Sequence, residues 1–263
     1  MRRHAELFGQ YLLQYTKVRL AYRWDFFLSL ATMTLATVFG VLVVFLMFRP
    51  IERLLGWSFW EIVFLYGFSL LPMSLFNTIS INLYYFPENY IVQGKFDRVL
   101  LRPVNPLFQI LFEQFRLEAL GDFLLGLFLL AFCAHRLGLK LGVLDASWLA
   151  LATLCGATIY TSVFIMLTSV SFFMEDRVGV MPPVYNMITF GRYPMDIYNG
   201  FIRFVLTWVL PFGFASFYPT AGVLRGDAYR LYSWLLPLVT AAFLVLAVLV
   251  WRRGARNYSS PGS

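Results

Sequence analysis

Charged side chains are scarce in this chain of 263 residues, since Asp, Glu, Lys and Arg make up only 13% of it. Soluble globular proteins carry about 25%. The apolar share is 60%, which leaves too few polar side chains to cover a water-soluble domain of this size. A soluble enzyme is nearly excluded, and so is a disordered chain, because disorder requires low hydrophobicity and high charge. The composition predicts a membrane protein.

Cysteine and histidine are equally scarce, with two of each. Cys133 and Cys155 lie in apolar stretches without a CxxC spacing, so neither a disulfide framework nor a thiolate metal site is expected. His4 and His135 have no second ligand at helical spacing. We therefore expect no metal in this chain.

The phosphate-binding motifs of ATP-using proteins are missing as well. None of the three lysines, Lys17, Lys95 and Lys140, is followed by Ser or Thr, so none fits the GxxxxGK[ST] pattern. GxGxxG and GxSxG are also absent from the sequence. If the protein uses ATP, a separate subunit must bind the nucleotide, and we expect no cofactor in this chain.

Apolar runs of about 20 residues, the length that crosses a bilayer, recur six times. Four are continuous, and two are irregular because charges or a proline interrupt them. We expect spans at Phe26–Phe48, Ile62–Tyr85, Leu107–Ala134, Trp148–Met174, Tyr198–Pro219 and Trp234–Trp251. The sequence thus predicts an all-α polytopic membrane protein with six transmembrane helices, forming one domain over residues 1–263.

Lysine and arginine are distributed unevenly between the two sides of these spans. With the N-terminus inside, 15 of the 21 basic residues are cytoplasmic and 6 are outside. Cytoplasmic loops are enriched in Lys and Arg, so we expect both termini in the cytoplasm. Orientation and anionic lipid also account for the net charge of +7. We expect membrane lipids as partners, and no nucleic acid.

Residues 1–25 form an amphipathic pattern. Aromatic residues such as Phe8, Tyr15 and Tyr22 recur at helical spacing, whereas Lys17 falls on the opposite side. The pattern is typical of a helix in the cytoplasmic headgroup region. A soluble helix packed on another subunit is the alternative. The segment lacks the apolar core of a cleavable signal peptide.

Acidic residues in the third predicted span require an explanation, because charge at membrane depth is costly. Glu118 and Asp122 could belong to a proton or substrate path. Alternatively, Leu107–Gly121 is a cytoplasmic or interfacial helix and the span begins near Asp122. On one continuous helix, Glu113 and Arg116 would share a face.

Uncharged polar and small residues mark two further candidate sites. Asn77 and Asn82 in the second span could form hydrogen bonds between helices or line a transport path. In the first span, Thr32, Ala36 and Gly40 make a stripe of small residues that permits close helix approach. The stripe could serve packing within the subunit or contact with a second subunit.

The segment between the second and third spans has a distinctive sequence, QGKFDRVLLRPVNP, over residues 93–106. Gly94 permits a turn, and Pro103 and Pro106 disfavour helix in the residues before them. Between the turn and the prolines, the charged residues would form a surface at the membrane face. The alternative is that the segment is an ordinary basic cytoplasmic loop. The residues with candidate roles are Gly94, Lys95, Phe96, Asp97, Arg98, Leu101, Arg102 and Pro103.

This segment resembles the pattern G-x-(F/L)-D-x-x-L-x-(R/K)-P-x-x-P of the ABC-2-type family of ABC transporter permeases. The sequence Gly191-Arg192-Tyr193-Pro194 is similar to that family's "R-x-P" motif at the start of the fifth span. Pro211-Phe212 and the later Ser216–Pro219 are similar to its proline-containing exit. The resemblance extends over the whole chain in span number, termini and loop placement.

The resemblance implies a function. Residues 84–106 would be the coupling segment that docks on an ATPase subunit. The region around Pro211 would form re-entrant helices that cap the outer end of the transport path, although a simple proline kink is the alternative. The chain would be a non-enzymatic permease subunit of an exporter in a bacterial inner membrane. Two permeases, identical or paralogous, would work with two ATPase subunits that carry ATP and Mg.

Other classes of function remain open on the sequence. A non-transporting membrane scaffold or assembly protein is one alternative, and an intramembrane enzyme is another. The scarcity of histidine and the absence of a paired catalytic set count against the enzyme. A transporter driven by ions would need acids at the midplane of corresponding halves, and only one span offers them.

Overall fold

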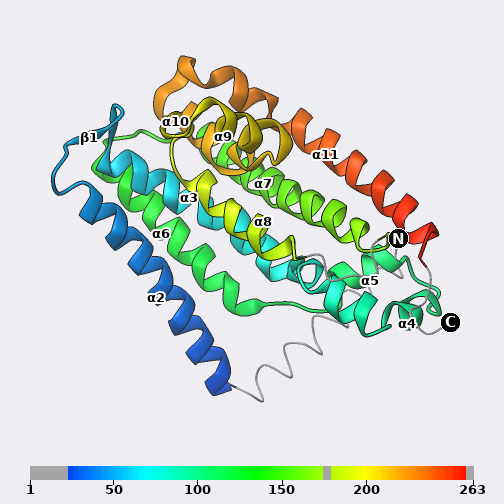
Figure 1. Cartoon of the computed structure of the whole chain (residues 1–263). Helices are drawn as coiled ribbons and strands as arrows, with labels where there is room; N and C mark the ends of the chain where they lie inside the picture. The colour runs from blue at the N-terminus through cyan, green and yellow to red at the C-terminus, as the bar shows by residue number, and fades with distance from the viewer. Residues whose placement is uncertain (1–22, 174–178, 259–263) are drawn as a thin grey trace.

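The computed structural model describes residues 23–173 and 179–258 (Figure 1). The interfacial helix predicted over residues 1–25 lies almost wholly outside this part. Five described helices are long and apolar enough to cross a membrane, which confirms the all-α polytopic class. They are α2 (Arg23–Met47), α3 (Phe59–Ile79), α6 (Leu120–Arg136), α7 (Val143–Val170) and α11 (Arg230–Arg256).

Shorter elements connect and cap these helices. A two-stranded hairpin, β1 (Arg53–Leu54) with β2 (Trp57–Ser58), joins α2 to α3. Short α-helical segments are α4 (Phe96–Leu100), α5 (Pro106–Phe112), α8 (Met181–Met187), α9 (Gly200–Phe204) and α10 (Tyr218–Arg225). Tighter or wider turns are η1 (Ile81–Leu83), η2 (Pro87–Val92), η3 (Leu117–Ala119), η4 (Ile188–Arg192), η5 (Met195–Ile197), η6 (Val205–Val209), η7 (Gly213–Phe217) and η8 (Gly226–Ala228).

The two ends of the bundle are defined by the elements that flank α3. Figure 1 shows β1 at one end of the bundle and α4 at the other. We call them the hairpin end and the α4 end. The start of α3 is fixed at the hairpin end by a capping box, in which Ser58 and Glu61 satisfy each other's backbone N–H groups.

Helix α3 is the central element of the bundle. Its neighbours bury 83% of its most apolar 18-residue stretch. Close helix approach explains this burial. A Cβ atom added to Gly126 of α6 would lie 2.7 Å from the carbonyl oxygen of Gly67, so the two backbones are nearly in contact. On another side, Gly156 of α7 lies against Ala215 and Pro72. Small residues permit such spacing, and it gives van der Waals packing where lipid offers no hydrophobic driving force.

The third predicted span is shorter than its apolar run. Helix α5 ends at Phe112, and the span covers Leu117–Arg136. Between them the N–H of Arg116 donates to the carbonyl of Thr78 at the end of α3, which draws the chain out of helix. Glu113 and Arg116 therefore do not share a helical face, and the expectation of one span over Leu107–Ala134 is wrong. The alternative, in which a separate segment precedes the span, agrees with the structure, except that the span begins at Leu117 and Asp122 therefore lies inside it.

The predicted fifth span, Tyr198–Pro219, is wrong as well. Its helices Gly200–Val209 and Gly213–Ala228 are bent by 76°. Asp196 before the pair accepts a hydrogen bond from Tyr229 after it, so the chain enters and leaves this region at the same place. The ring of Tyr229 packs 6.0 Å from that of Trp57 in the hairpin. The pair is therefore re-entrant at the hairpin end.

The fifth crossing is made instead by residues 181–195, which run along α3. Tyr185 donates to Asn77 near the α4 end at 3.0 Å, and Arg192 contacts Tyr66 farther along α3. Asp196 follows at the hairpin end. The segment was missed because α8 and η4 together are shorter and more polar than an ordinary span.

The corrected crossing changes the count of basic residues on each side of the membrane, because two arginines are reassigned. Arg192 lies in the middle of the bundle, and Arg203 lies at the hairpin end, where it pairs with Asp196 at 3.7 Å. With residues outside the described part kept where the sequence places them, the count becomes 13 at the α4 end and 7 at the hairpin end. The excess still favours a cytoplasmic α4 end.

The packing of α3 against α6 yields a first prediction. Replacing Gly126 by Leu forces a side chain against the Gly67 carbonyl, and overpacking of this kind costs about 1–3 kcal/mol. We expect the unfolding temperature of the purified protein in detergent to fall by several degrees. Gly200→Leu is the control, because a Cβ at Gly200 meets no atom within 4 Å. Equal unfolding temperatures for the two variants would contradict the packing.

Candidate functional site

The segment around α4 combines a buried anchor with an exposed surface. Phe96 is fully buried, and its ring lies 5.1 Å from Phe172 after α7 and 6.3 Å from Trp251 on α11. Phe86 completes this aromatic cluster, at 5.8 Å from Phe96. The ring of Phe96 therefore joins α4 to the end of α7 and to α11.

The exposed side of α4 is basic and apolar at once. Lys95, Arg98 and Arg102 are exposed, and Leu101 is 85% exposed. An apolar side chain surrounded by polar residues is typical of a protein contact surface. We call Lys95, Arg98, Leu101 and Arg102 the α4 surface.

The turns on either side of α4 agree with the sequence prediction. Gly94 has a φ of +64°, a conformation that glycine adopts without strain. Pro103 is exposed, and Asn105 caps α5 by accepting hydrogen bonds from the N–H groups of Leu107 and Phe108. Asp97 lies in the first turn of α4 and is partly buried.

A polar cavity of about 260 Å³ adjoins the α4 surface. Its lining includes Lys95, Arg98, Arg102, Gln109 and Glu113.

A hydrogen-bonded network reaches this cavity from the end of α3. Tyr90 donates to Glu113 at 2.5 Å, and the amide of Asn82 donates to Tyr90 and to the carbonyl of Ile110. Burial and the hydrogen bond to Glu113 raise the pKa of Tyr90 above its usual range, so the phenol stays protonated. Asn82 thus lies in the packed α4 end of the protein. Its side chain is fully buried and forms hydrogen bonds to two other segments of the chain.

Asn77 and Glu118 are also buried near the α4 end. Asn77 accepts the Tyr185 hydroxyl, which joins α3 to the fifth crossing. Glu118, only 2% exposed, lies in η3 just before α6. The neighbouring carbonyl of Ala119 accepts the hydroxyl of Ser74, so this turn is fixed against α3.

Asp122 belongs to a charged cluster in the middle of the bundle, which we call the mid-depth cluster: Thr37, Tyr66, Asp122 and Arg192. Thr37 donates to Asp122 at 2.9 Å, and Tyr66 donates to the carbonyl of Thr37. Arg192 reaches the Tyr66 hydroxyl from the other side, at 3.4 Å. Four separate segments of the chain thus meet at one level.

The small-residue stripe of α2 is divided by this arrangement. Gly40 lies directly against the Tyr66 hydroxyl of the same chain, so its small size serves internal packing. Thr32 and Ala36 are exposed. Only 11% of the most apolar 18-residue stretch of α2 is buried within the described chain. Most of this helix therefore faces lipid or another subunit.

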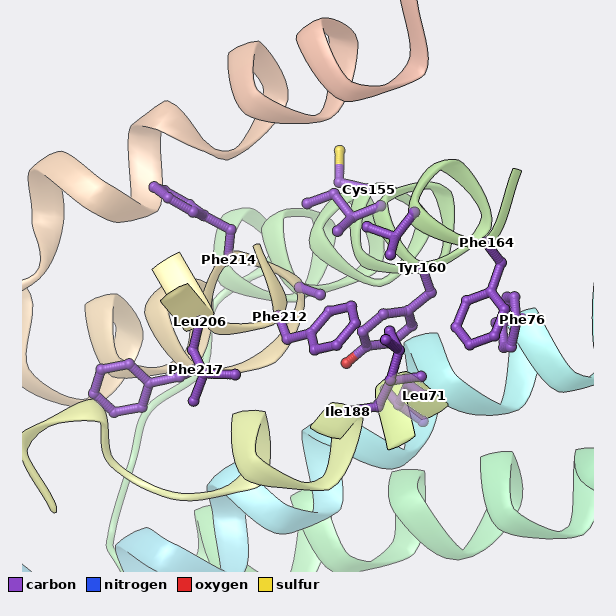
Figure 2. Packing of buried hydrophobic residues seen from close by; sticks show 14 of the residues in the cluster. Leu71, Phe76, Cys155, Tyr160, Phe164, Ile188, Leu206, Phe212, Phe214 and Phe217 are labelled. Atoms are coloured by element: carbon purple, nitrogen blue, oxygen red, sulfur yellow. The ribbon is translucent and has the colours of Figure 1, made fainter. Parts of the chain in front are cut away.

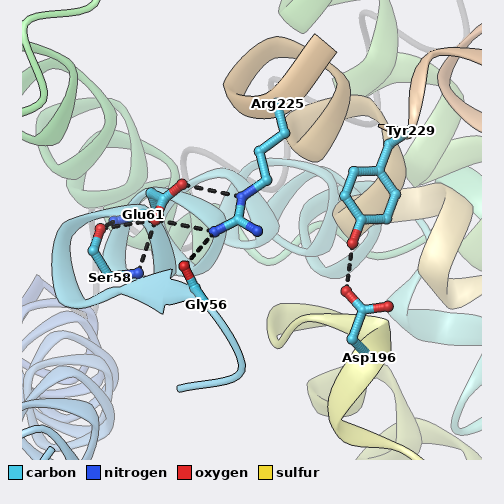
Figure 3. Close-up of polar contacts among 6 residues, drawn as sticks. All are labelled: Gly56, Ser58, Glu61, Asp196, Arg225 and Tyr229. Atoms are coloured by element: carbon cyan, nitrogen blue, oxygen red, sulfur yellow. Dashed lines mark hydrogen bonds and ion pairs between the residues drawn. The ribbon is translucent and has the colours of Figure 1, made fainter. Parts of the chain in front are cut away.

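The re-entrant region is held to the hairpin end by charged and aromatic contacts. Arg225 of α10 pairs with Glu61 at 3.1 Å and donates to the carbonyl of Gly56 at 2.8 Å (Figure 3). Its guanidinium carbon also lies 3.6 Å from the centroid of the Trp57 ring. The Asp196–Tyr229 hydrogen bond lies beside this group. These contacts hold the re-entrant helices against the hairpin.

Pro211 marks the break between the two re-entrant helices. The residue after it, Phe212, is fully buried and points at Tyr160 of α7, with ring centroids 5.4 Å apart (Figure 2). The carbonyl of Phe212 also accepts the hydroxyl of Ser216. The break therefore inserts an aromatic anchor into the core, and a proline kink in a continuous span does not describe it.

Sequence reasoning missed several residues of these sites. Arg192 was counted as cytoplasmic, and Tyr66, Glu61 and Arg225 were not singled out. The signal for Arg192 was weak, because the segment before it, from Met181 to Phe190, mixes apolar residues with two prolines, Asn186 and Thr189. No local pattern pairs Glu61 with Arg225, which are separated by 164 positions.

Comparison with known proteins identifies the family. The profile of the family described as ABC-2 family transporter protein matches residues 31–262. The match covers most of the sequence, and the chain belongs to this family. No curated protein and no solved structure matches it. The predicted ABC-2 membership is confirmed: the chain is a multi-pass membrane protein with the role of a transporter permease, in a family whose membrane subunits are generally not enzymes.

The Glu61–Arg225 pair yields a second prediction. Both side chains are partly buried, so Arg225→Gln or Glu61→Gln leaves a charge without its partner and should cost about 1–3 kcal/mol of stability. The double variant should lose less stability than the sum of the losses of the two single variants. Unfolding temperatures in detergent measure the stability of all three variants. Arg230→Gln is the control, because its pair with Asp227 is exposed and should change stability by about 0.5 kcal/mol or less.

Proposed function

We propose that this chain is the permease subunit of an ATP-driven exporter, and that the α4 surface docks a separate ATPase subunit. The α4 surface carries the proposal, because exposed Leu101 and three cations adjoin a helix anchored through Phe96 to α7 and α11. ATP and Mg belong to the partner, and the whole chain acts as a single permease domain in a bacterial inner membrane.

The anchor gives the coupling a physical route. Force on the exposed side of α4 passes through the ring of Phe96 to Phe172 and Trp251, because densely packed aromatic side chains do not compress. ATP binding that closes two ATPase subunits would thus tilt α7 and α11. The permease dimer would then alternate between two conformations. Each conformation would bind one of the two ATPase states, open or closed, more tightly than the other.

A second permease subunit supplies the other wall of the path. The fifth crossing carries polar side chains on its uncovered face, with Asn186 exposed and Thr189, Arg192 and Tyr193 partly exposed. Polar groups at this depth face protein or water rather than lipid. We place the path along this face, between two copies or paralogues, with Thr32 and Ala36 of α2 as candidate contacts.

Orientation is the first experimental test. With Cys133 and Cys155 replaced by Ala, Val143→Cys should react with an impermeant thiol reagent on whole cells and Leu101→Cys should not. Both positions are highly exposed, at 87% and 85%, so access to the side of the membrane decides the result. Labelling at position 101 from outside would overturn the cytoplasmic placement of the α4 end, of both termini and of the coupling surface.

Docking on the ATPase is tested by a matched pair of leucines. Leu101→Glu places a charge in the proposed contact, and disruption of a central contact typically costs about 2 kcal/mol or more. We expect at least about thirtyfold weaker association with the ATPase subunit, measured by co-purification and by binding of the purified subunit. Leu144→Glu is the control, since Leu144 is 84% exposed and lies near the hairpin end. Equal ATPase recovery with both variants would refute docking at α4.

A further inference from the structure

Arg192 holds a positive charge at the middle of the bundle. Its contacts on α3 are Tyr66 and Met73, which lie on either side of the midpoint of the span Phe59–Ile79. Thr37, which belongs to the same cluster, is at the centre of the span Phe26–Met47. A guanidinium at this depth is costly, and arginines in such positions pair with carboxylates or carbonyls or mark a substrate pathway.

The hydrogen-bonding capacity of this guanidinium is mostly unused. Nη1 donates to the Tyr66 hydroxyl at 3.4 Å, which is long, and Nη2 donates to the sulfur of Met73 at 3.2 Å, a weak acceptor. Nε is buried, and among the described residues it has no hydrogen-bond partner. A guanidinium has five N–H donors, so strong acceptors are missing here.

The nearest carboxylate does not supply them. Asp122 interacts electrostatically with Arg192 but lies beyond ion-pair distance, and its Oδ1 already accepts the hydroxyl of Thr37. The ring of Tyr66 covers one face of the guanidinium, with its centroid 5.1 Å from the guanidinium carbon. The cluster therefore holds Arg192 in place without giving its guanidinium a strong acceptor among the described residues.

Access comes from the uncovered face of the fifth crossing. Arg192 is partly exposed there, one turn beyond Thr189 and two turns beyond Asn186. This spacing, at intervals of three residues, aligns the three polar side chains along a single stripe. Met73, at the other side of the guanidinium, is also partly exposed.

From these observations we infer that Arg192 binds an anionic group, a carboxylate or phosphate, of the transported molecule. Planar guanidinium donors match the oxygens of both groups and bind them in pairs, and low polarity around the site strengthens the contact. The inference rests on the proposed function, because it assigns a substrate class to the path. Asn186 and Thr189, which lie closer to the α4 end, would provide polar contacts for the transported molecule along the same face.

The experiment measures the electrostatic potential near the guanidinium from the reactivity of a cysteine placed beside it. The full-length chain, with Cys133 and Cys155 replaced by Ala, carries Met73→Cys and is reconstituted in phosphatidylcholine nanodiscs. Its modification rate is measured with two methanethiosulfonate reagents, one bearing a sulfonate and one a trimethylammonium group. Each rate is divided by that of a free thiol.

The anionic reagent should be favoured, and Arg192→Gln should lower the anionic-to-cationic ratio by about tenfold or more, because one full charge beside the thiol is lost. Arg192→Lys should keep most of the preference. Arg203→Gln is the control, since Arg203 lies at the hairpin end and pairs with Asp196. An unchanged ratio in Arg192→Gln, or no reaction with either reagent, would overturn the inference.

Protection experiments identify the source of the anion and do not depend on the folding of any variant at position 192. Inorganic phosphate that slows modification at position 73 points to a soluble anionic substrate. Phosphatidylglycerol that slows it, when added to the nanodiscs in place of part of the phosphatidylcholine, points to a lipid headgroup. Protection by neither overturns the anion site.

The same preparations separate this inference from the proposed function. ATPase co-purification without the charge preference would overturn the anion site alone. The charge preference with protection, in a chain that never recovers an ATPase from its native membrane, would overturn the proposed function and leave the anion site standing.

Discussion

The close packing of α3 against its neighbours is the constraint on which the other features depend. Gly67 and Gly126 bring α3 and α6 nearly into backbone contact, and Gly156 does the same for α7 and the re-entrant turn. Because α3 is enclosed, several of its polar side chains form hydrogen bonds to other segments. Tyr66 meets α2 and Arg192, Ser74 meets the turn before α6, and Asn77 meets Tyr185.

The two ends of the bundle are held by different kinds of contact. At the α4 end, Phe96 joins a short exposed helix to α7 and α11. At the hairpin end, Arg225 fixes the re-entrant helices to Gly56 and Glu61. The mid-depth cluster lies between them on α3. The α4 end is thus joined to α7 and α11 through Phe96, whereas α3 links the mid-depth cluster to the hairpin end through Tyr66 and Glu61.

Much of the fold followed from hydropathy, whereas the irregular crossings did not. Long apolar runs identify α2, α3, α7 and α11 without reference to tertiary structure, and the turn at Gly94 followed from its local sequence. The crossing at 181–195 escaped because it is short and because tertiary contacts, such as the Tyr185–Asn77 hydrogen bond and the burial of Val184 and Ile188, do not register in hydropathy. The run at 198–219 was assigned as a span because a buried re-entrant pair is as apolar as a spanning helix.

The candidate sites divide in the same way. The α4 surface was predictable from spacing and from the resemblance to ABC-2 permeases, although Phe96 is a buried anchor rather than part of the contact. Asp122 was noticed because charge is rare in a span, but its partners lie on distant segments. Contacts between residues more than 80 positions apart, such as Thr37 with Asp122, are set by tertiary packing. A single sequence carries no local sign of them.

The central claim is that this permease works through a separate ATPase held at α4. The most direct measurement is the composition of the complex purified from native membranes through a tag on this chain, with each subunit counted by quantitative mass spectrometry. The account predicts a polypeptide with an ATP-binding motif in equal copy number with the permease. Purification of the chain alone, or with partners that bind no nucleotide, would contradict it.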